Sequence, residues 1–227
     1  MVIAQRHGTV IIADRNIEAA EVTAADIVKS GGIATAQALD ISSVEAVRDF
    51  VNQTIKKNGR IDALVNSAGI TGPTGINLEE IDPKSFQQVI EINLFGAIWL
   101  TQALLPSMKA QKYGRMIHVA SIAGKEGNPG MSPYNSAKAG MIGFVKGVAK
   151  EAAPFGVTIN SIAPAVIRTP MNATTADETL KYMIARIPVG RVGEPEEVAE
   201  TIAFAVSRAC SFTTGFTFDA SGGRATY

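Results

Sequence analysis

Cysteine is nearly absent: this chain of 227 residues contains only one, Cys210. A single cysteine cannot form a disulfide within the chain and cannot supply a multi-cysteine zinc site. The two histidines, His7 and His118, are far apart in the sequence and match no metal-binding motif. We therefore expect no metal, a small buried side chain at Cys210, and a reducing compartment such as the cytoplasm.

The chain also lacks an excess of positive or negative charge. Lysine plus arginine and aspartate plus glutamate both number 21, so the formal net charge is zero, and no basic stripe is visible. This balance argues against nucleic acid or an anionic membrane as the partner and leaves a small-molecule substrate. The sequence shows no signal peptide, and no apolar run approaches the about 18 residues that a membrane helix needs. We expect a cytoplasmic protein.

Apolar residues are abundant, at 46% of the chain, so a substantial core can form. Short apolar runs alternate with helical patterns from one end of the chain to the other. The expected strands are Thr9–Ala13, Ala34–Ala38, Ile61–Asn66, Gly114–Ala120, Val157–Ile162 and Thr217–Asp219. The expected helices are Glu18–Ser30, Ser43–Asn58, Pro83–Gln111, Pro133–Ala153, Asp177–Ala185 and Pro195–Ser207.

The strands are nearly all apolar, as in "ALVN" (63–66) and "RMIHVA" (115–120). Such strands are typical of a parallel sheet that is covered on both faces. Regular strand–helix alternation predicts a doubly wound, Rossmann-like α/β fold, here as one domain over residues 1–227. In this fold ligands bind at the carboxyl ends of the strands. The loops after the strands are therefore the places to look for a site.

One such loop leads to Tyr134 and Lys138, which are four residues apart and so share one face of a helix. A lysine ammonium beside a phenol should lower the pKa of the phenol and make it an acid or base. Ser121 follows the strand Gly114–Ala120 and can hydrogen-bond a substrate oxygen. The tyrosine–lysine pair alone is also what an ordinary surface helix would show.

The wider pattern resembles the short-chain dehydrogenase/reductase family over nearly the whole chain. The matching stretches, in family order and spacing, are "IIADRN" (11–16), "ALDISS" (38–43), "IDALVNSAGI" (61–70), "INLFGAIWLTQALLPSM" (92–108), "GRMIHVASIAG" (114–124), "YNSAKAGMIGF" (134–144), "KEAAPFGVTINSIAPAVIRTPM" (150–171) and "TGFTFDASGG" (214–223).

The resemblance implies four catalytic residues. Tyr134 is the proton donor or acceptor, Lys138 lowers its pKa and holds the nicotinamide ribose, and Ser121 orients the reacting oxygen. Asn93 anchors a water that links the lysine to solvent; without the family it would be a satisfied core amide or a cap. The implied reaction is hydride transfer between a nicotinamide and a carbinol or carbonyl carbon.

The cofactor is expected to be NAD(H) rather than NADP(H). Asp14 ends the strand Thr9–Ala13, where a carboxylate accepts ribose hydroxyls and repels a 2′-phosphate. Arg15 weakens this preference, because arginine is the usual phosphate partner. The resemblance implies that Asp40 contacts adenine; the alternative is a cap for the next helix, and both roles are compatible. The residues that the resemblance assigns to the cofactor are Asp14, Asp40, Asn66, Ala68, Gly69, Tyr134, Lys138, Pro164 and Val166.

Two residues depart from the family pattern. Ser67 stands where the family has a second asparagine. Ala165 stands where the family usually has glycine, and an alanine there requires a negative φ. A larger departure is at the start. The family places a first strand and a Thr-Gly-x-x-x-Gly-x-Gly phosphate loop before the helix that leads to Thr9, but here only 13 residues precede Asp14 and their only glycine is Gly8.

A missing first strand would leave a gap of two strand spacings, ~9.6 Å, between Thr9–Ala13 and Ile61–Asn66. We expect either an incomplete version of a normal enzyme, or a sheet that is rearranged there or filled by another segment or subunit.

The substrate is expected to contact residues 165–192. In that region Met171, Met183 and Ile187 are more typical of packing. Arginines could hold a substrate carboxylate, and the alternative is that they lie on a solvated surface. The candidates are Arg168, Arg186 and Arg224. Arg224 is near the chain end and could reach the site of its own chain or of a partner chain. Tyr227 is a further chain-end candidate.

The stretches "GKEGNP" (124–129) and "CSFTTGFTFDASGGRATY" (210–227) resemble family members that oxidise sugars and 2-keto-3-deoxy sugar acids. This makes a polyol, sugar or sugar acid the expected substrate. The alternative is a 3-oxoacyl carrier-protein reductase, a subclass that favours NADP and a basic docking patch.

The helix from Pro133 carries Gly140, Gly143 and Gly147, which suggests close approach by another backbone. With the family's helical interface this predicts a homotetramer, or failing that a homodimer. A hypothesis of another class is a truncated, cofactor-impaired member with a structural or oligomerising role.

Overall fold

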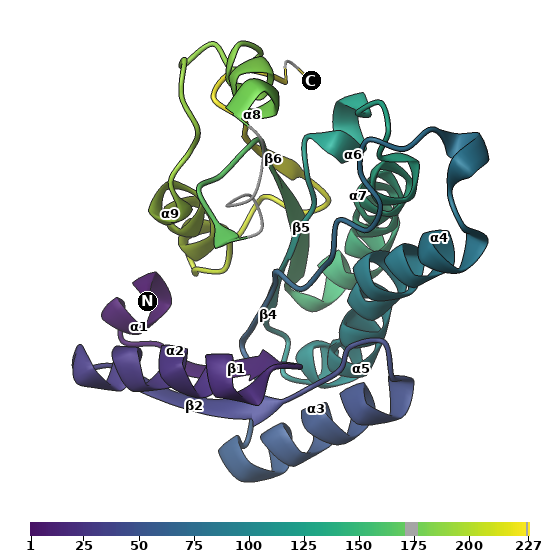
Figure 1. Ribbon diagram of the computed structural model, residues 1–227. Coiled ribbons are helices and arrows are strands. Elements are labelled where there is room, and N and C mark those ends of the chain that lie inside the picture. The colour runs from purple at the N-terminus through teal and green to yellow at the C-terminus, as the bar shows by residue number, and fades with distance from the viewer. Residues whose placement is uncertain (171–176, 226) are drawn as a thin grey trace.

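The computed structural model describes residues 1–170, 177–225 and 227 (Figure 1). Met171 and part of the expected substrate region therefore lie outside the described residues. The strands are β1 (Thr9–Asp14), β2 (Ile33–Ala38), β3 (Ala63–Asn66), β4 (Gly114–Val119), β5 (Val157–Pro164) and β6 (Thr217–Ala220). The α-helices are α1 (Val2–Gln5), α2 (Ile17–Lys29), α3 (Val44–Asn58), α4 (Pro83–Ile90), α5 (Gly96–Ala110), α6 (Ala123–Glu126), α7 (Ser132–Ala152), α8 (Asp177–Ile184) and α9 (Pro195–Ala205). Short 3-10 helices η1 (Leu78–Glu80) and η3 (Ala153–Phe155) and a π-helix η2 (Glu91–Phe95) complete the elements.

The expected α/β architecture is confirmed, with element ends close to the expected ones. Polar side chains begin three of the helices: Asn16, Ser43 and Asp82 each accept a hydrogen bond from the third backbone N–H beyond them. Helix α3 ends at Gly59 with a φ of 82°, a left-handed conformation that glycine adopts without strain. Since Ser43 caps α3, Asp40 does not have the capping role that was its alternative.

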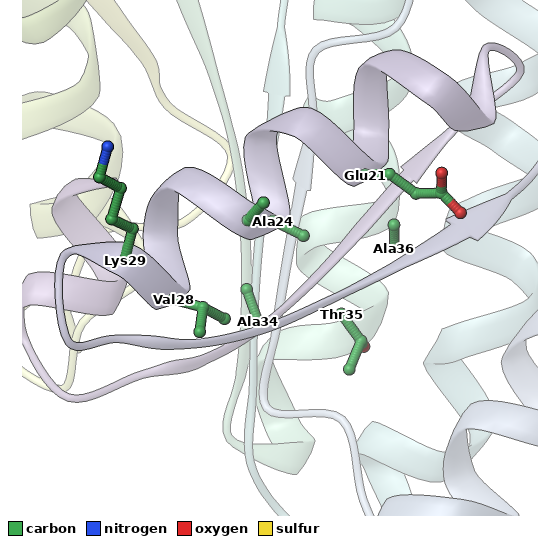
Figure 2. Close-up of a pocket in the computed structure, with 8 residues that line it drawn as sticks. Glu21, Ala24, Val28, Lys29, Ala34, Thr35 and Ala36 are labelled. Atoms are coloured by element: carbon green, nitrogen blue, oxygen red, sulfur yellow. The ribbon is translucent and has the colours of Figure 1, made fainter.

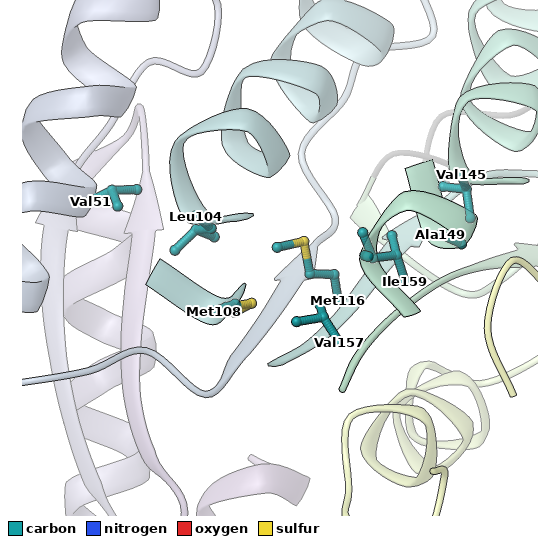
Figure 3. Close-up of a cluster of buried hydrophobic side chains, with 9 residues drawn as sticks. Val51, Leu104, Met108, Met116, Val145, Ala149, Val157 and Ile159 are labelled. Carbon is teal, nitrogen blue, oxygen red and sulfur yellow. The ribbon is translucent and has the colours of Figure 1, made fainter. Parts of the chain in front are cut away.

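The four parallel strands β3, β4, β5 and β6 form the core sheet in that order. Helices α3, α5 and α7 cover one face, as the cluster in Figure 3 shows with Val51, Leu104, Val145 and Met116, which is fully buried. The neighbouring Ile117 points to the other face and packs against α9. Strands β4 and β5 are buried almost throughout, as expected for strands between two helical layers.

Strands β1 and β2 form a separate two-stranded parallel sheet. Within the described part of the chain, β1 pairs only with β2, and β3 pairs only with β4. The sheet is thus interrupted where the gap was expected, and no other described strand pairs with β1 or β3 there. Helix α2 packs on this small sheet, and Arg6 near α1 forms a salt bridge with Glu200 of α9.

The small sheet differs from what its apolar sequence predicted. Its strands are only half-buried, and Ile33 is 65% exposed. The expectation of helices on both faces is therefore correct for β4 and β5 but wrong for β1 and β2. A sheet of two strands that stops at an unpaired edge offers too little area to be enclosed as fully as the central strands.

The expected helix Pro83–Gln111 is a continuous stretch of α4, the π-helix η2 and α5. By length and composition, Pro83–Ala110 would be sufficient to cross a membrane, contrary to the expectation that no segment comes near. Its apolar side chains contribute to the interior of this structure instead, since Val89, Leu100 and Met108 are buried.

Candidate active site

Ser121, Tyr134 and Lys138 lie together at the carboxyl end of the core sheet. Ser121 follows β4, and a hydrogen bond joins its hydroxyl to the phenol of Tyr134 in the first turn of α7. Lys138, one turn further along α7, places Nζ 5.5 Å from the centre of the Tyr134 ring. The spacing thus places the tyrosine and the lysine on one face of α7, with the phenol at the serine.

The Lys138 ammonium is buried, with the residue 3% exposed. It donates to the carbonyl oxygen of Val119 at 2.6 Å, which fixes it at the end of β4. Helix α6 approaches α7 closely here: a Cβ on Gly124 would lie 2.6 Å from the carbonyl carbon of Lys138. The Lys138 ammonium is therefore fixed by β4, and the Lys138 backbone is packed against α6.

The pKa of Tyr134 is raised above 10, because burial disfavours the phenolate more than the Ser121 hydrogen bond favours it. Burial also lowers the pKa of Lys138 to about 8. The expectation that Lys138 lowers the pKa of Tyr134 is therefore wrong for this structure. Lys138 is not among the causes of the shift; its own ammonium is destabilised by burial and is hydrogen-bonded to Val119.

Asn93 occupies the π-helix η2 and is fully buried. A π turn shifts the backbone hydrogen bonds by one residue and so frees a carbonyl. The side-chain Nδ2 of Asn93 donates to the Val89 and Ile70 carbonyls, and its Oδ1 accepts from the Ile70 N–H. A Cβ on Gly69 would collide with that Oδ1 and would lie 3.6 Å from Lys138 Nζ. Asn93 thus joins the loop after β3 to the catalytic cluster.

The residues expected to contact the cofactor follow the strand ends. Asp14 ends β1, and its Oδ1 accepts from the Asn16 N–H. Asp40 follows β2 and accepts from both the N–H and the hydroxyl of Ser42, which lowers the pKa of its carboxyl group with a smaller contribution from Arg15. Both acids sit at the same end of parallel strands as the catalytic cluster.

Asn66 ends β3, and its Oδ1 accepts from the Ala68 N–H. At the end of β5, the Pro164 carbonyl accepts from Ile122, and the Val166 carbonyl accepts from Gly193. Ala165 meets its requirement, because His7 and Lys112 are the only described non-glycine residues with positive φ.

A buried histidine behind this loop was not foreseen as part of the site. His118 in β4 is fully buried; its Nδ1 lies 3.2 Å from Asn66 Nδ2 and its Nε2 lies 3.0 Å from Thr101 Oγ1. Because the Thr101 hydroxyl donates to the Ala97 carbonyl, the histidine N–H is on Nε2 and Nδ1 accepts from Asn66. Burial, with the Lys138 charge, lowers the pKa of His118 to about 4. The imidazole therefore stays neutral and orients Asn66.

The three candidate substrate arginines lie in different surroundings. Arg168 is exposed and contacts both carboxylate oxygens of Glu194. Arg186 lies over the Tyr182 ring at 5.0 Å. Arg224 is nearly buried and donates to Glu126 and Asn128 of its own chain.

A groove of about 560 Å³ lies between α2 and β2, away from these residues (Figure 2). Ala34 and Ala36 point from β2 toward α2, and Glu21 and Lys29 lie at either end. The groove follows the first half of β2, whereas the candidate site lies at the carboxyl ends of the strands. Small alanine side chains account for it.

Comparison with known proteins gives consistent results. The family model described as enoyl-(acyl carrier protein) reductase matches residues 2–225. A 2-dehydro-3-deoxy-L-rhamnonate dehydrogenase (NAD(+)) of Sphingomonas sp. (strain SKA58) is 41% identical over 220 residues, 97% of this chain and 86% of the relative. A 3-oxoacyl-[acyl-carrier-protein] reductase of Synechocystis sp. is 42% identical over 207 residues, 90% of this chain and 81% of the relative.

The crystal structure of gox2181 has the same fold, with a TM-score of 0.94 and 30% sequence identity, and covers 98% of this chain and 88% of its own. Together with the family model and the two relatives, this match shows that the chain belongs to the short-chain dehydrogenase/reductase family of oxidoreductases.

Proposed function

We propose that this protein is an NAD(H)-dependent oxidoreductase that interconverts an alcohol and a ketone on a polyol, sugar or sugar acid. The observation that supports it most is the joint placement of Ser121, Tyr134 and Lys138, with the phenol hydrogen-bonded to the serine and the lysine fixed on Val119. A bound nicotinamide would supply or accept the hydride.

Tyr134 is the general acid of the proposed reduction. Its raised pKa keeps the phenol protonated near neutral pH, which is the form that gives a proton to a carbonyl oxygen. Ser121 holds the same substrate oxygen by its hydroxyl. Lys138 would hold the nicotinamide ribose, since its ammonium lies on the same helix face as the phenol. In the oxidation direction the same groups act in reverse.

The described residues fit parts of the cofactor well. Asp14 and Asp40 offer carboxylates after β1 and β2, and Gly69 lets the Asn93 side chain pack against the loop beside Lys138. Asn66 and Ala68 lie at the end of β3 and in the loop after it, which His118 and Asn93 hold in place. The pyrophosphate has no glycine-rich loop in the printed sequence. Cofactor binding by this chain is therefore the first point to test.

NAD(H) is proposed over NADP(H) because Asp14 would repel a 2′-phosphate. Arg15 lies close enough to Asp40 to contribute to the lowered pKa of that carboxyl group, the smallest of its causes. The relative from Sphingomonas is described as NAD(+)-dependent, which supports the same preference.

The sugar-acid assignment rests on the same relative, with Arg168 and Arg186 as the residues proposed to pair with a substrate carboxylate. The second candidate function, a 3-oxoacyl carrier-protein reductase, is supported by the Synechocystis relative. The zero net charge disfavours it, because an acidic carrier protein would need a basic docking patch.

Two measurements test the proposal. Titration with NADH, followed by nicotinamide fluorescence, should show saturable binding; no binding at millimolar NADH would exclude the enzymatic function for this polypeptide. With cofactor bound, the Tyr134→Phe variant should lose about 100-fold or more in kcat at an unchanged NADH dissociation constant. Equal kcat for the variant and the unmodified protein would exclude Tyr134 as the acid.

A homotetramer in the cytoplasm is proposed for the assembly, with a homodimer as the smaller alternative. Gly143 and Gly147 face open space on α7, whereas Gly140 packs against Leu94 of the same chain. Sedimentation should then show a Gly143→Leu variant shifted to smaller species. If the protein associates but never binds cofactor, the structural or oligomerising role becomes the better description.

A further inference from the structure

The segment that joins Ser121 to Tyr134 is held by the C-terminal residues. We call residues 122–131, which contain α6, the connecting segment. The guanidinium of Arg224 donates from Nε to Glu126 Oε2 at 2.9 Å and from Nη2 to Asn128 Oδ1 at 2.9 Å. The Arg224 side chain is 5% exposed and that of Glu126 is 28% exposed, so this contact is largely removed from water.

A second contact on the same segment reinforces the first. The Tyr227 hydroxyl donates to the Lys125 carbonyl, and the Lys125 ammonium lies 5.1 Å from the centre of the Tyr227 ring. The same ammonium pairs with Asp219 at the end of β6. Two successive residues of α6, Lys125 and Glu126, are thus bound by the C-terminal part of the chain.

Asn128 transmits this attachment to α7. Its backbone N–H donates to Asn135 Oδ1 at 3.1 Å, and its carbonyl accepts from Asn135 Nδ2 at 2.8 Å. Asn135 follows Tyr134 in the first turn of α7, where Met131 caps the helix without a side-chain hydrogen bond among the described residues. The paired amide contacts therefore fix the helix turn that carries the phenol.

These contacts form one continuous chain from Arg224 through Asn128 and Asn135 to the residue beside Tyr134. A guanidinium is planar and its N–H bonds point in set directions, so it can orient two acceptors at once. Lysine at this place could satisfy the charge of Glu126 but not both acceptors with the same geometry.

We propose that Arg224 is a positioning residue for Tyr134: by holding Glu126 and Asn128 it sets the first turn of α7 and thereby the contact between the Tyr134 phenol and the Ser121 hydroxyl. This inference rests on the proposed function for its kinetic consequence. Arg224 itself does not touch the reacting atoms in this assignment, which distinguishes it from a substrate-binding arginine.

The test compares Arg224→Gln, Arg224→Lys and Asn128→Ala with the control Arg60→Gln. Arg60 is an exposed arginine that also pairs with a carboxylate, that of Asp62, away from the site. We expect Arg224→Gln and Asn128→Ala to lower kcat about 10-fold with little change in KM for NADH, because misplacing a catalytic group acts on the chemical step. Arg224→Lys should fall in between, and Arg60→Gln should leave kcat unchanged.

The double variant Glu126→Gln/Arg224→Gln separates positioning from charge. It removes the unpaired carboxylate, so thermal stability should recover toward that of the unmodified protein, while kcat stays low because Asn128 still lacks its donor. Recovery of kcat together with stability would overturn the proposal. So would an unchanged kcat in Arg224→Gln, and so would a pure rise in substrate KM.

A readout without cofactor keeps this inference distinct from the proposed function. The Tyr134 phenol can be titrated by ultraviolet difference spectroscopy against Tyr134→Phe, and exchange of the Asn128 N–H can be followed in the same samples. In Arg224→Gln we expect faster exchange and a Tyr134 titration moved toward ordinary tyrosine, as water reaches the turn. If the unmodified protein proves inactive, the proposed function fails, whereas an unmoved titration and unmoved exchange would overturn the role of Arg224.

Discussion

Replacing His118 by asparagine should remove a large part of the acid sensitivity of the fold. The neutral imidazole of His118 accepts from Asn66 and donates to Thr101 in a fully buried position, and its pKa is lowered to about 4. In the unfolded chain the same side chain has a pKa of about 6.5. Asparagine can offer a donor and an acceptor there without titrating.

The shifted pKa of His118 makes the free energy of unfolding depend on pH, because the folded and unfolded states bind protons differently. Between pH 6.5 and pH 4 the unfolded chain binds a proton at His118 that the native protein refuses, so the stability contribution is complete above pH 6.5 and is lost as the pH falls. At about 1.36 kcal/mol per pH unit, the complete loss is about 3 kcal/mol. About 2 kcal/mol of it should fall between pH 7 and pH 5.

Urea denaturation at a series of pH values between 7 and 5 measures this difference. The unmodified protein should lose about 2 kcal/mol more of its free energy of unfolding over that interval than His118→Asn does. His7→Asn is the control, because His7 is exposed and has a φ of 65°, which asparagine tolerates. Identical pH dependence in the unmodified protein and His118→Asn would refute the buried neutral histidine.

Three further substitutions have defined outcomes. Gly124→Ala places a Cβ 2.6 Å from the Lys138 carbonyl carbon, and should cost about 1–3 kcal/mol in urea denaturation with a parallel fall in kcat. Asp14→Ala should lower the preference for NAD over NADP, measured as the ratio of kcat/KM values, by about 10-fold; an unchanged ratio would remove Asp14 from the cofactor site. Met116→Ala, at a fully buried position in the core sheet, should cost about 2–5 kcal/mol of unfolding free energy, and a loss under 1 kcal/mol would contradict the packing described.

Much of the fold could be predicted because the signals were local. The Asp82-Pro83 pair marked a helix start, Asn58-Gly59 marked a helix end, and the apolar run of β4 marked a buried strand. Helix α6 was missed, since four residues without a capping side chain leave no periodic pattern. The π-helix at Asn93 was missed for a related reason: a single inserted residue does not disturb the apolar pattern enough to be read.

The residues of the candidate site could be predicted from the sequence, but the pKa values and long-range contacts of those residues could not. Ser121, Tyr134 and Lys138 come together as their spacing and the family resemblance suggested. The direction of the Tyr134 pKa was not predictable, because it depends on burial, which is a property of the packed structure. The contacts of His118 with Thr101 and of Arg224 with Asn128 join distant parts of the chain, and no short sequence window contains both partners.

The division of the sheet also has a consequence for how the molecule opens. Strands β1 and β2 are joined through α2 alone, so their pairing closes a short loop and needs no contact with the other sheet. The core sheet depends on partners far apart in the chain, such as Ser161 with Thr217. Because cooperativity is carried across shared strands, the β1–α2–β2 unit should behave as a foldon of its own. Amide hydrogens of this unit should exchange with solvent when it opens on its own. Amide hydrogens of β4 and β5 should exchange only when the whole chain unfolds.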